Sequence, residues 1–482
     1  MQNSYLTIFK SALNYVPSKL LVMVYPLIII PLFSNMLEAK EMSMYFIAIQ
    51  FLNVICTCSS DWVTKSVLRY HEYYKIKNLL EEFYSNIFVL TIMAHVIVIA
   101  LFCIFKDIIQ LHFGLDTATF ILTVTLVIPC GLRQLLYQYL RVINNSFLYT
   151  ISIFLYQLFL IVLFLIFVKG VYNANAILLA MNIAIVFIDI YILKKINFTL
   201  SFKISFKKQV MIETMRYAIP LVLTNVSYWL LLHFSKMYFQ NASLFLYTSI
   251  IGFTWILVQY IIQPVGSVFM FAGFPVLVSK YEHKEQVEQY WTRLVQLYVL
   301  SILPLTLFFC FYFNEVTQAI FPKEYYTGAF VLPFFAIAVF SHELLKLVNS
   351  KYHLQNKTYY EMLVAVLAVP LVILINIVLI KEYILLGAAI AICASELLLL
   401  LINGFVRFKN FAYLNYMKVF KSICLTGILG VLVYFIIAAI NVGLNSIAVL
   451  AGKVINIIDM VLYFVIYYSL CILLKRTILI SK

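Results

Sequence analysis

The chain of 482 residues is 64% hydrophobic and only 11% charged, with a formal net charge of +14. Soluble domains carry about 25% charged residues, so this composition excludes an ordinary soluble fold and predicts a polytopic membrane protein. The positive charge would favour nucleic acid as the partner of a soluble protein. Here the cytoplasmic loops of a membrane protein account for it, and we expect no nucleic-acid partner.

Apolar segments recur from one end of the chain to the other. Most have about the length that a helix needs to cross ~30 Å of hydrocarbon. They predict an all-α fold with about 14 transmembrane helices. In chain order the predicted helices cover residues 15–35, 44–62, 86–105, 118–139, 147–168, 174–193, 217–239, 244–272, 294–313, 326–345, 360–380, 383–405, 422–440 and 455–474.

Basic residues alternate between the two sides of these predicted helices. With the N-terminus in the cytoplasm, the cytoplasmic segments carry 25 of the 34 Lys and Arg residues. Because positive charge is enriched in cytoplasmic loops, we expect both termini to be cytoplasmic. Three further basic residues fall inside predicted helices, and the outer loops carry the remaining six: Lys40, Lys106, Lys169, Lys323, Lys381 and Lys453.

The order of the helices predicts two lobes. Residues 1–193 and 217–405 each hold six predicted helices, and the basic segment 194–216 is predicted to be a cytoplasmic linker between them. Residues 406–482 then add two C-terminal helices. An even number of helices in each half makes the halves parallel repeats, an arrangement that encloses a central cavity and suits alternating access.

Three basic residues lie inside predicted helices, namely Lys19 in the first, Arg133 in the fourth and Lys236 near the outer end of the seventh. A charge inside the membrane is costly, so these side chains are the first candidates to face a cavity and contact an anionic group. The alternative is that they extend to the nearest interface without a functional role. Gln134 and Gln138 share one helical face and make the stretch around Arg133 locally polar.

A second candidate group lies at the cytoplasmic end of the second predicted helix. Asp61, Lys65 and Arg69 recur every four residues and therefore share one helical face. Lys and Arg both suit phosphate, so the two basic residues could form a cytoplasmic mouth that receives an anionic head group. An ordinary solvated helix end, in which Asp61 pairs with Lys65, is the alternative.

Glu396 is the deepest acid, in the middle of the predicted helix 383–405. A lone carboxyl group at this depth is a candidate proton or cation site, or the partner of a cation in the cavity. A neutral, hydrogen-bonded packing residue is an equal alternative. Asp61 is the second coupling candidate, whereas Asp189 and Glu343 lie nearer the predicted interfaces and are expected to be structural.

Motifs for catalysis, metal binding or cofactor binding are missing from the sequence. The 13 glycines nearly exclude a glycine loop that binds phosphate. The His and Cys residues do not recur at metal-ligand spacing, and the cysteines lie within apolar segments as small hydrophobic residues do. We therefore predict no catalytic residue, no metal and no cofactor, and we do not expect an enzyme.

Several predicted helix boundaries share a pattern of apolar, aromatic and short polar residues. They are Ile30–Tyr45, Asp61–Tyr70, Arg216–Lys236 with Leu246 and Tyr247, Pro322–Leu332, and Asn356–Thr358. In these segments the chain resembles the polysaccharide flippases of the multidrug/oligosaccharidyl-lipid/polysaccharide exporter superfamily. It departs from the family at Ser235, because many members have an acid before the basic residue that corresponds to Lys236. The coupling role of that acid is not carried over to this chain.

The resemblance implies a transporter that flips an undecaprenyl-pyrophosphate-linked oligosaccharide from the cytoplasmic to the outer leaflet, for assembly of a surface polysaccharide such as O-antigen or capsule. It implies a multi-pass protein of the bacterial inner membrane. Its partners would be the lipid-linked oligosaccharide, membrane lipids and other membrane proteins of polysaccharide assembly. On this interpretation Lys65 and Arg69 capture the substrate, Lys19 and Arg133 hold the pyrophosphate in the inward-open state, and Lys236 attracts it outward.

Two alternative functions are weighed against this one. A cation-coupled multidrug efflux antiporter would favour acids over bases inside the membrane, and three embedded bases against one deep acid argue mildly against it. A polysaccharide polymerase usually presents a long outer loop for catalysis, and the predicted outer loops of this chain are short.

Overall fold

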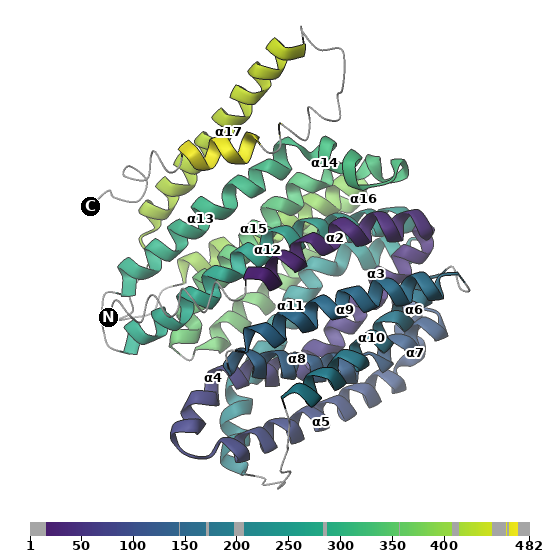
Figure 1. Ribbon diagram of the computed structural model, residues 1–482, viewed down its shortest axis with the longest axis vertical. Coiled ribbons are helices and arrows are strands. Elements are labelled where there is room, and N and C mark those ends of the chain that lie inside the picture. The colour runs from purple at the N-terminus through teal and green to yellow at the C-terminus, as the bar shows by residue number, and fades with distance from the viewer. Residues whose placement is uncertain are drawn as a thin grey trace. The chain divides into compact units, whose positions relative to one another are not determined.

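The computed structural model describes residues 16–143, 145–169, 173–196, 207–282, 287–355, 357–406, 414–445, 459 and 462–470. Within these ranges the regular elements are helices, without a strand (Figure 1). Twelve helices of the described part are long and apolar enough to cross a membrane. The predicted all-α, multi-pass membrane fold is therefore confirmed.

The chain divides into two compact units. The first comprises Met1–Phe253 and Gln355–Lys381, and the second comprises Thr254–Leu354 and Glu382–Lys482. The helices α12 (Phe245–Glu282) and α16 (Thr358–Phe405) each contribute one part to each unit. The boundaries of these units differ from the lobe boundaries predicted from the sequence. The units group helices by their contacts, whereas the predicted lobes follow the repeat of six helices. The lobe boundaries therefore stay a prediction.

The first unit holds the N-terminal helices. Its further elements are α2 (Val16–Met36), α3 (Ala39–Cys56), η1 (Thr57–Asp61), α4 (Trp62–Ile76), α5 (Leu80–Ile104), α6 (Lys106–Phe113), α7 (Thr117–Thr125), α8 (Val127–Val142), α9 (Ser146–Phe167), α10 (Ala174–Lys195) and α11 (Lys208–Asn241). Residues 197–206 of the predicted linker lie outside the described residues.

The second unit holds the remaining elements. They are α13 (Val287–Phe311), α14 (Phe313–Ile320), η2 (Lys323–Gly328), α15 (Val331–Leu354) and α17 (Tyr416–Asn445). The buried Tyr298 of α13 donates a hydrogen bond to the carbonyl oxygen of Phe340 on α15 at 2.7 Å. This bond ties together two central helices of the unit.

The number of helices agrees with the number predicted from the sequence when the predicted helices 383–405 and 455–474 are taken into account. The predicted helices 360–380 and 383–405 both fall in α16, which is interrupted at Ile384 by a non-helical backbone with φ 48° and ψ −114°. The predicted helix 455–474 lies mostly outside the described residues, of which only 459 and 462–470 belong to it. About 14 crossings therefore remain consistent with the structure.

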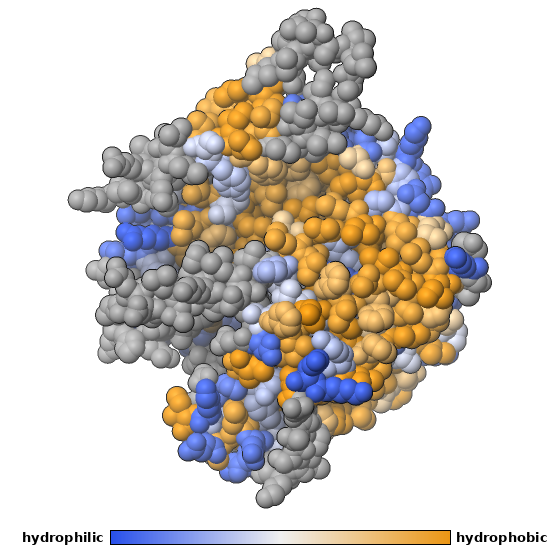
Figure 2. Space-filling view, in the orientation of Figure 1, coloured by the Kyte–Doolittle hydropathy of each residue, from blue (hydrophilic) through white to orange (hydrophobic). Residues whose placement is uncertain are grey.

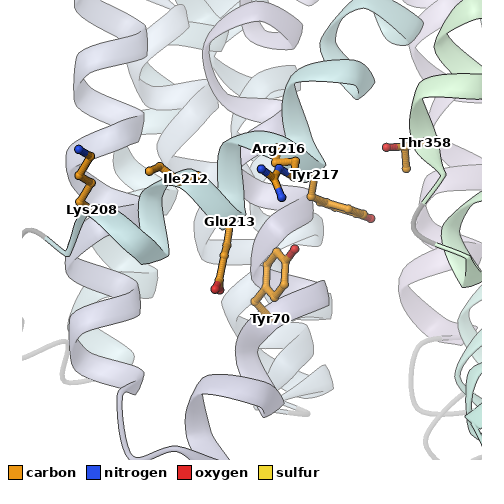
Figure 3. A pocket seen from close by; sticks show the side chains of 7 residues that line it. All are labelled: Tyr70, Lys208, Ile212, Glu213, Arg216, Tyr217 and Thr358. Carbon is orange, nitrogen blue, oxygen red and sulfur yellow. The ribbon is translucent and has the colours of Figure 1, made fainter.

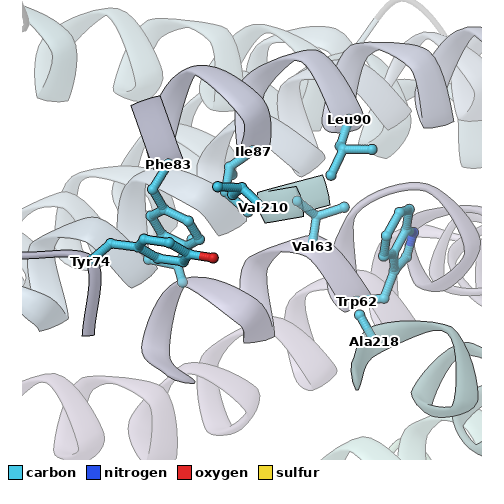
Figure 4. Packing of buried hydrophobic residues seen from close by; sticks show 9 residues of the cluster. Trp62, Val63, Tyr74, Phe83, Ile87, Leu90, Val210 and Ala218 are labelled. Carbon is cyan, nitrogen blue, oxygen red and sulfur yellow. The ribbon is translucent and has the colours of Figure 1, made fainter. Parts of the chain in front are cut away.

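A hydrophobic cluster joins α4, α5 and α11 in the first unit (Figure 4). The ring of Tyr74 on α4 stacks on that of Phe83 on α5, with centroids 4.8 Å apart. Val210 and Ala218 approach the same cluster from α11. This packing fixes the three helices against one another at the ends that the charge pattern predicts to be cytoplasmic.

Large apolar side chains remain exposed on the helix surfaces. Val96 of α5 is 62% exposed and Phe187 of α10 is 58% exposed. Figure 2 shows hydrophobic residues over much of the visible described surface. Apolar patches of this extent are rare on soluble monomers, whereas hydrocarbon chains can cover them without cost.

A π-helical turn, η1, connects α3 to α4 and was not predicted from the sequence. Its Ser59 and Ser60 are buried, and Thr57 donates a hydrogen bond to the Asp61 carboxylate at 3.2 Å. Such a turn holds one residue more than an α-helical turn and occurs frequently at functional sites. It places the coupling candidate Asp61 at the junction of the two helices.

Gly252 allows α12 to pack closely against α3, and we expect Gly252→Ala to destabilise the protein. A Cβ atom at this position would lie 2.3 Å from the ring of Phe46. Relieving such overpacking costs about 1–3 kcal/mol. The apparent melting temperature of the purified protein in detergent should fall by several degrees. Gly427→Ala is the matched control, since a Cβ there has no neighbour within 4 Å, and an equal loss in both variants would contradict the prediction.

Candidate functional site

A cavity of about 670 Å³ opens in the first unit where the end of α4, the first turns of α11 and the start of α16 meet. Its lining residues are Tyr70, Lys208, Ile212, Glu213, Arg216, Tyr217 and Thr358 (Figure 3). We call it the basic pocket. The charge pattern of the sequence predicts that this end of the helices lies on the cytoplasmic side.

The start of α11 positions the basic residues of the pocket. Lys207, which precedes the helix, forms an ion pair with Glu82 of α5. Its backbone N–H donates to the Asn86 side chain at 3.2 Å. Lys208 and Arg216 then follow within α11, about two turns apart, and both line the pocket.

Glu213 is the only acid that lines the basic pocket among the described residues, and it is held by a neighbour. Tyr74 donates a hydrogen bond to its carboxylate at 2.7 Å. Burial and this carboxylate raise the pKa of Tyr74, so the phenol stays a neutral donor. Lys208 and Arg216 form no ion pair with a described residue, which leaves both charges available to an anion.

Two tyrosines complete the basic pocket. The rings of Tyr70 and Tyr217 meet edge to face, with centroids 5.9 Å apart. In Figure 3 the Tyr70 ring rises from α4 toward the segment of α11 that bears Arg216 and Tyr217. Aromatic faces suit sugar rings and guanidinium groups suit phosphate, so the pocket combines groups for both parts of a sugar phosphate.

The predicted capture residues belong to the helix that forms one wall of this pocket. Lys65 and Arg69 both lie on α4, and Arg69 directly precedes Tyr70. Their side chains lie outside the described residues, so their capture role stays a prediction. Lys19 lies in α2 and is partly buried.

Arg133 of α8 is held between helices of the first unit. Its guanidinium carbon lies 3.9 Å from the centroid of the Tyr156 ring on α9, a cation–π contact. The glutamines that follow it have other partners: Gln134 accepts a hydrogen bond from Ser60 at 3.0 Å, and Gln138 accepts one from Arg141 at 2.8 Å. The residues around Arg133 are therefore polar, as expected, but their partners lie on several different elements.

Asp189 of α10 is buried inside the protein. It is only 2% exposed, and neither carboxylate oxygen accepts a hydrogen bond from a described residue. Its electrostatic partner is Arg133. The sequence could not reveal this pairing, because the two residues lie on different helices.

The side chain of Lys236 on α11 is enclosed by the protein. It is only 2% exposed, and it forms no ion pair among the described residues. Next to it, Ser235 donates a hydrogen bond to Asn376 of α16 at 2.8 Å. The indole of Trp229, two turns earlier, donates to the backbone of Gln50 at 2.9 Å. Polar groups and a cation are therefore enclosed together on this part of α11.

In the second unit Glu396 is fully buried and lies 3.1 Å from the Nδ1 atom of His342 on α15. His342 was not singled out in the sequence. Lys351, also missed, is 2% exposed and donates to the backbone oxygens of Asn403 and, at 2.7 Å, Val406. A cation at the C-terminal end of a helix satisfies free carbonyl groups, so Lys351 stabilises the end of α16.

Solved structures of transporters share this fold. The inward closed conformation of the lipid II flippase MurJ is 14% identical in sequence, with a TM-score of 0.69, over 98% of this chain and 100% of that one. The MATE multidrug transporter DinF-BH is 14% identical with a TM-score of 0.63, over 82% and 94%. An inward-facing MATE multidrug resistance transporter is 12% identical with a TM-score of 0.56, over 84% and 93%.

Neither the models of known protein families nor the curated protein sequences contain a match to this chain. At the identities above, the structural likeness establishes the fold and not the substrate. The expected resemblance is confirmed at this level: the chain has the fold of the exporter superfamily that includes the MurJ flippase and the MATE transporters.

Proposed function

We propose that this protein flips a polyprenyl-pyrophosphate-linked oligosaccharide, of the undecaprenyl type, from the cytoplasmic to the outer leaflet of a bacterial inner membrane. The product would feed the assembly of a surface polysaccharide such as O-antigen or capsule. The transporter fold supports the coarse activity, movement of a substrate across a membrane.

The basic pocket is the observation that carries the proposal. Arg216 and Lys208 offer two charges without a counter-ion among the described residues, beside the edge-to-face pair Tyr70 and Tyr217. A pyrophosphate head group with attached sugars needs both kinds of contact, and the polyprenyl tail can stay in the lipid. On this proposal the pocket receives the head group first. The embedded cations Lys19, Arg133 and Lys236 act after capture.

Drug efflux, the alternative, fits the pocket less well. The substrates of multidrug antiporters are often cations, and Arg216 and Lys208 would repel a cation at the cytoplasmic entrance. Glu213, the single acid among the described lining residues, is engaged with Tyr74. A polymerase is disfavoured because the outer connections within the described ranges are short.

We expect Arg216→Gln to lower the amount of surface polysaccharide about 10-fold. Loss of one charge-assisted contact at an exposed site costs about 1.4 kcal/mol, which corresponds to a factor of ten. The gene is deleted in its host and restored with wild type or variant, and surface polysaccharide and lipid-linked intermediates are then measured. The variant should accumulate the lipid-linked repeat on the cytoplasmic side.

Lys421→Gln, which removes an exposed basic residue at the start of α17, is the matched control and should behave as wild type. Arg216→Lys keeps the charge and should restore part of the activity. Normal polysaccharide in the deletion strain together with altered drug tolerance would reject the flippase and favour the efflux antiporter.

A further inference from the structure

Two cysteines on neighbouring helices of the first unit have no part in the proposed transport path. Cys56 ends α3, and Cys130 lies in the first turn of α8. Both are free thiols, of which Cys56 is buried and Cys130 is partly exposed. The Cys56 thiol donates a hydrogen bond to the sulfur of Cys130. Two thiols in direct contact can be joined once one of them is oxidised.

The contact between the thiols belongs to an ordered packing of the two segments. Ser60 lies about one turn after Cys56, and Gln134 lies one turn after Cys130. Ser60 donates a hydrogen bond to the Gln134 side chain at 3.0 Å. Residues four apart on a helix share a face. The faces that join Ser60 to Gln134 are therefore the faces that bring the two sulfurs together.

Gly131 allows the close approach of α8 that this packing requires. A Cβ atom at this position would lie 3.2 Å from the Cβ atom of Ser60 and 2.3 Å from the ring of His95 on α5. The spacing leaves no room for a side chain at position 131. A disulfide bond needs the two sulfurs about 2.05 Å apart, which only closely packed backbones permit.

Arg133 makes Cys130 the more reactive sulfur of the pair. It follows Cys130 by one turn on α8, and its guanidinium donates a hydrogen bond to the Cys130 sulfur. A neighbouring cation favours the thiolate, which is the form of cysteine that attacks a peroxide. Cys130 is also the more exposed of the two thiols. Cys56, which is buried against it, is placed to react second.

We propose that Cys130 and Cys56 form an oxidation site for hydrogen peroxide. In the first step the Cys130 thiolate attacks one peroxide oxygen. The S–O bond forms, the O–O bond breaks and hydroxide leaves, so the sulfur gives two electrons to the peroxide and becomes a sulfenic acid. In the second step the Cys56 sulfur attacks this sulfenic acid. The S–S bond forms, the S–O bond breaks, and the leaving hydroxyl takes the Cys56 proton and departs as water.

The product is a covalent bond between α3 and α8 that a dithiol reductant opens again. Hydrogen peroxide is small and uncharged, so it needs no open pocket to reach Cys130. The site stands independently of the transported substrate, because neither thiol belongs to the basic pocket.

The test uses the purified full-length protein in detergent, first reduced and then exposed to hydrogen peroxide. The remaining thiols are alkylated after denaturation and counted by mass spectrometry. Of the eight cysteines, wild type should lose two as thiols, and peptide mapping should find Cys56 linked to Cys130. Cys130→Ser should keep Cys56 as a free thiol. Cys56→Ser should instead carry a sulfenic acid on Cys130, which the trapping reagent dimedone captures.

Cys103→Ser is the matched control, since Cys103 is an exposed cysteine of the same unit outside the pair. It should form the bond between Cys56 and Cys130 at the rate of wild type. Arg133→Gln should form it about 10-fold more slowly, because one charge-assisted hydrogen bond to the attacking sulfur is lost.

Absence of the Cys56–Cys130 bond from peroxide-treated wild type would overturn the site, and so would a bond from Cys56 to Cys58 in its place. Capture by dimedone at Cys56 in Cys130→Ser would overturn the order of the two steps. An unchanged rate in Arg133→Gln would overturn the activation by Arg133. The peptide map of wild type decides the site even where a serine variant does not fold.

Discussion

Replacing Arg133 with glutamine is expected to lower transport of the lipid-linked oligosaccharide about 100-fold. If Arg133 holds the pyrophosphate through two charge-assisted bonds of about 1.5 kcal/mol each, their loss amounts to two factors of ten. The stacking of its guanidinium on Tyr156 fixes the direction of those bonds. Flipping in lipid vesicles and surface polysaccharide in the complemented host measure the effect. Arg133→Lys keeps a charge without the planar fork, so we expect an intermediate loss of about 10-fold.

A purely structural role of Arg133 predicts a different result for transport in a double variant. Asp189 is buried without a hydrogen bond from a described residue and interacts with Arg133, so Arg133→Gln also leaves an acid without its cation. The double variant Arg133→Gln/Asp189→Asn removes both charges and should recover thermal stability. Transport should stay as low as in Arg133→Gln. Recovery of transport in the double variant would show that Arg133 serves only to balance Asp189.

Replacing Lys236 with methionine is expected to stabilise the protein while it reduces transport at least 10-fold. Burying an ammonium group without an ion pair costs several kcal/mol, and methionine fills nearly the same volume without charge. One kcal/mol corresponds to about 2–4 °C for domains of about 150–250 residues, so a gain of several kcal/mol should raise the melting temperature in detergent by several degrees. The same substitution removes the charge that we propose attracts the pyrophosphate outward.

Lys381→Met, at an exposed position of α16, is the control for this pair of effects. It should change neither the melting temperature nor transport. A lower melting temperature in Lys236→Met would mean that the lysine stabilises the fold. Higher stability with normal transport would remove Lys236 from the substrate path.

The helices themselves could be predicted closely from the sequence, and the contacts between them could not. Hydrocarbon admits only backbone that satisfies its own hydrogen bonds, so each apolar segment had to be a helix. The contact of Arg133 with Tyr156, the bond of Ser235 to Asn376 and the pair of Glu396 with His342 join separate helices. Their pairing depends on the rotation of each helix in the packed structure, which the pattern of a single segment does not reveal.

Two local features could not be predicted from the sequence pattern. Enclosure of Lys236 within the protein and extension to the interface are both compatible with its place near a predicted helix end, so the sequence does not distinguish them. The basic pocket uses Lys208 and Arg216, which the sequence placed in a charged linker and at the edge of a helix. Only the packing of α11 against α4 makes a pocket of them, and no spacing within α11 predicts that neighbour.

The π-helical turn η1 has a consequence for how this sequence can change over evolutionary time. A π-helical turn holds one residue more than an α-helical turn, so deletion of one residue within Thr57–Asp61 converts the turn into α-helix and keeps the helices on both sides in register. Insertion of a further residue has no such outlet. Because an α-helix turns by about 100° for each residue, it would rotate Trp62 and Val63 out of the cluster of α4, α5 and α11. Loss of one residue from this segment should therefore be tolerated in descendants of this protein, whereas a gain should be lost by selection.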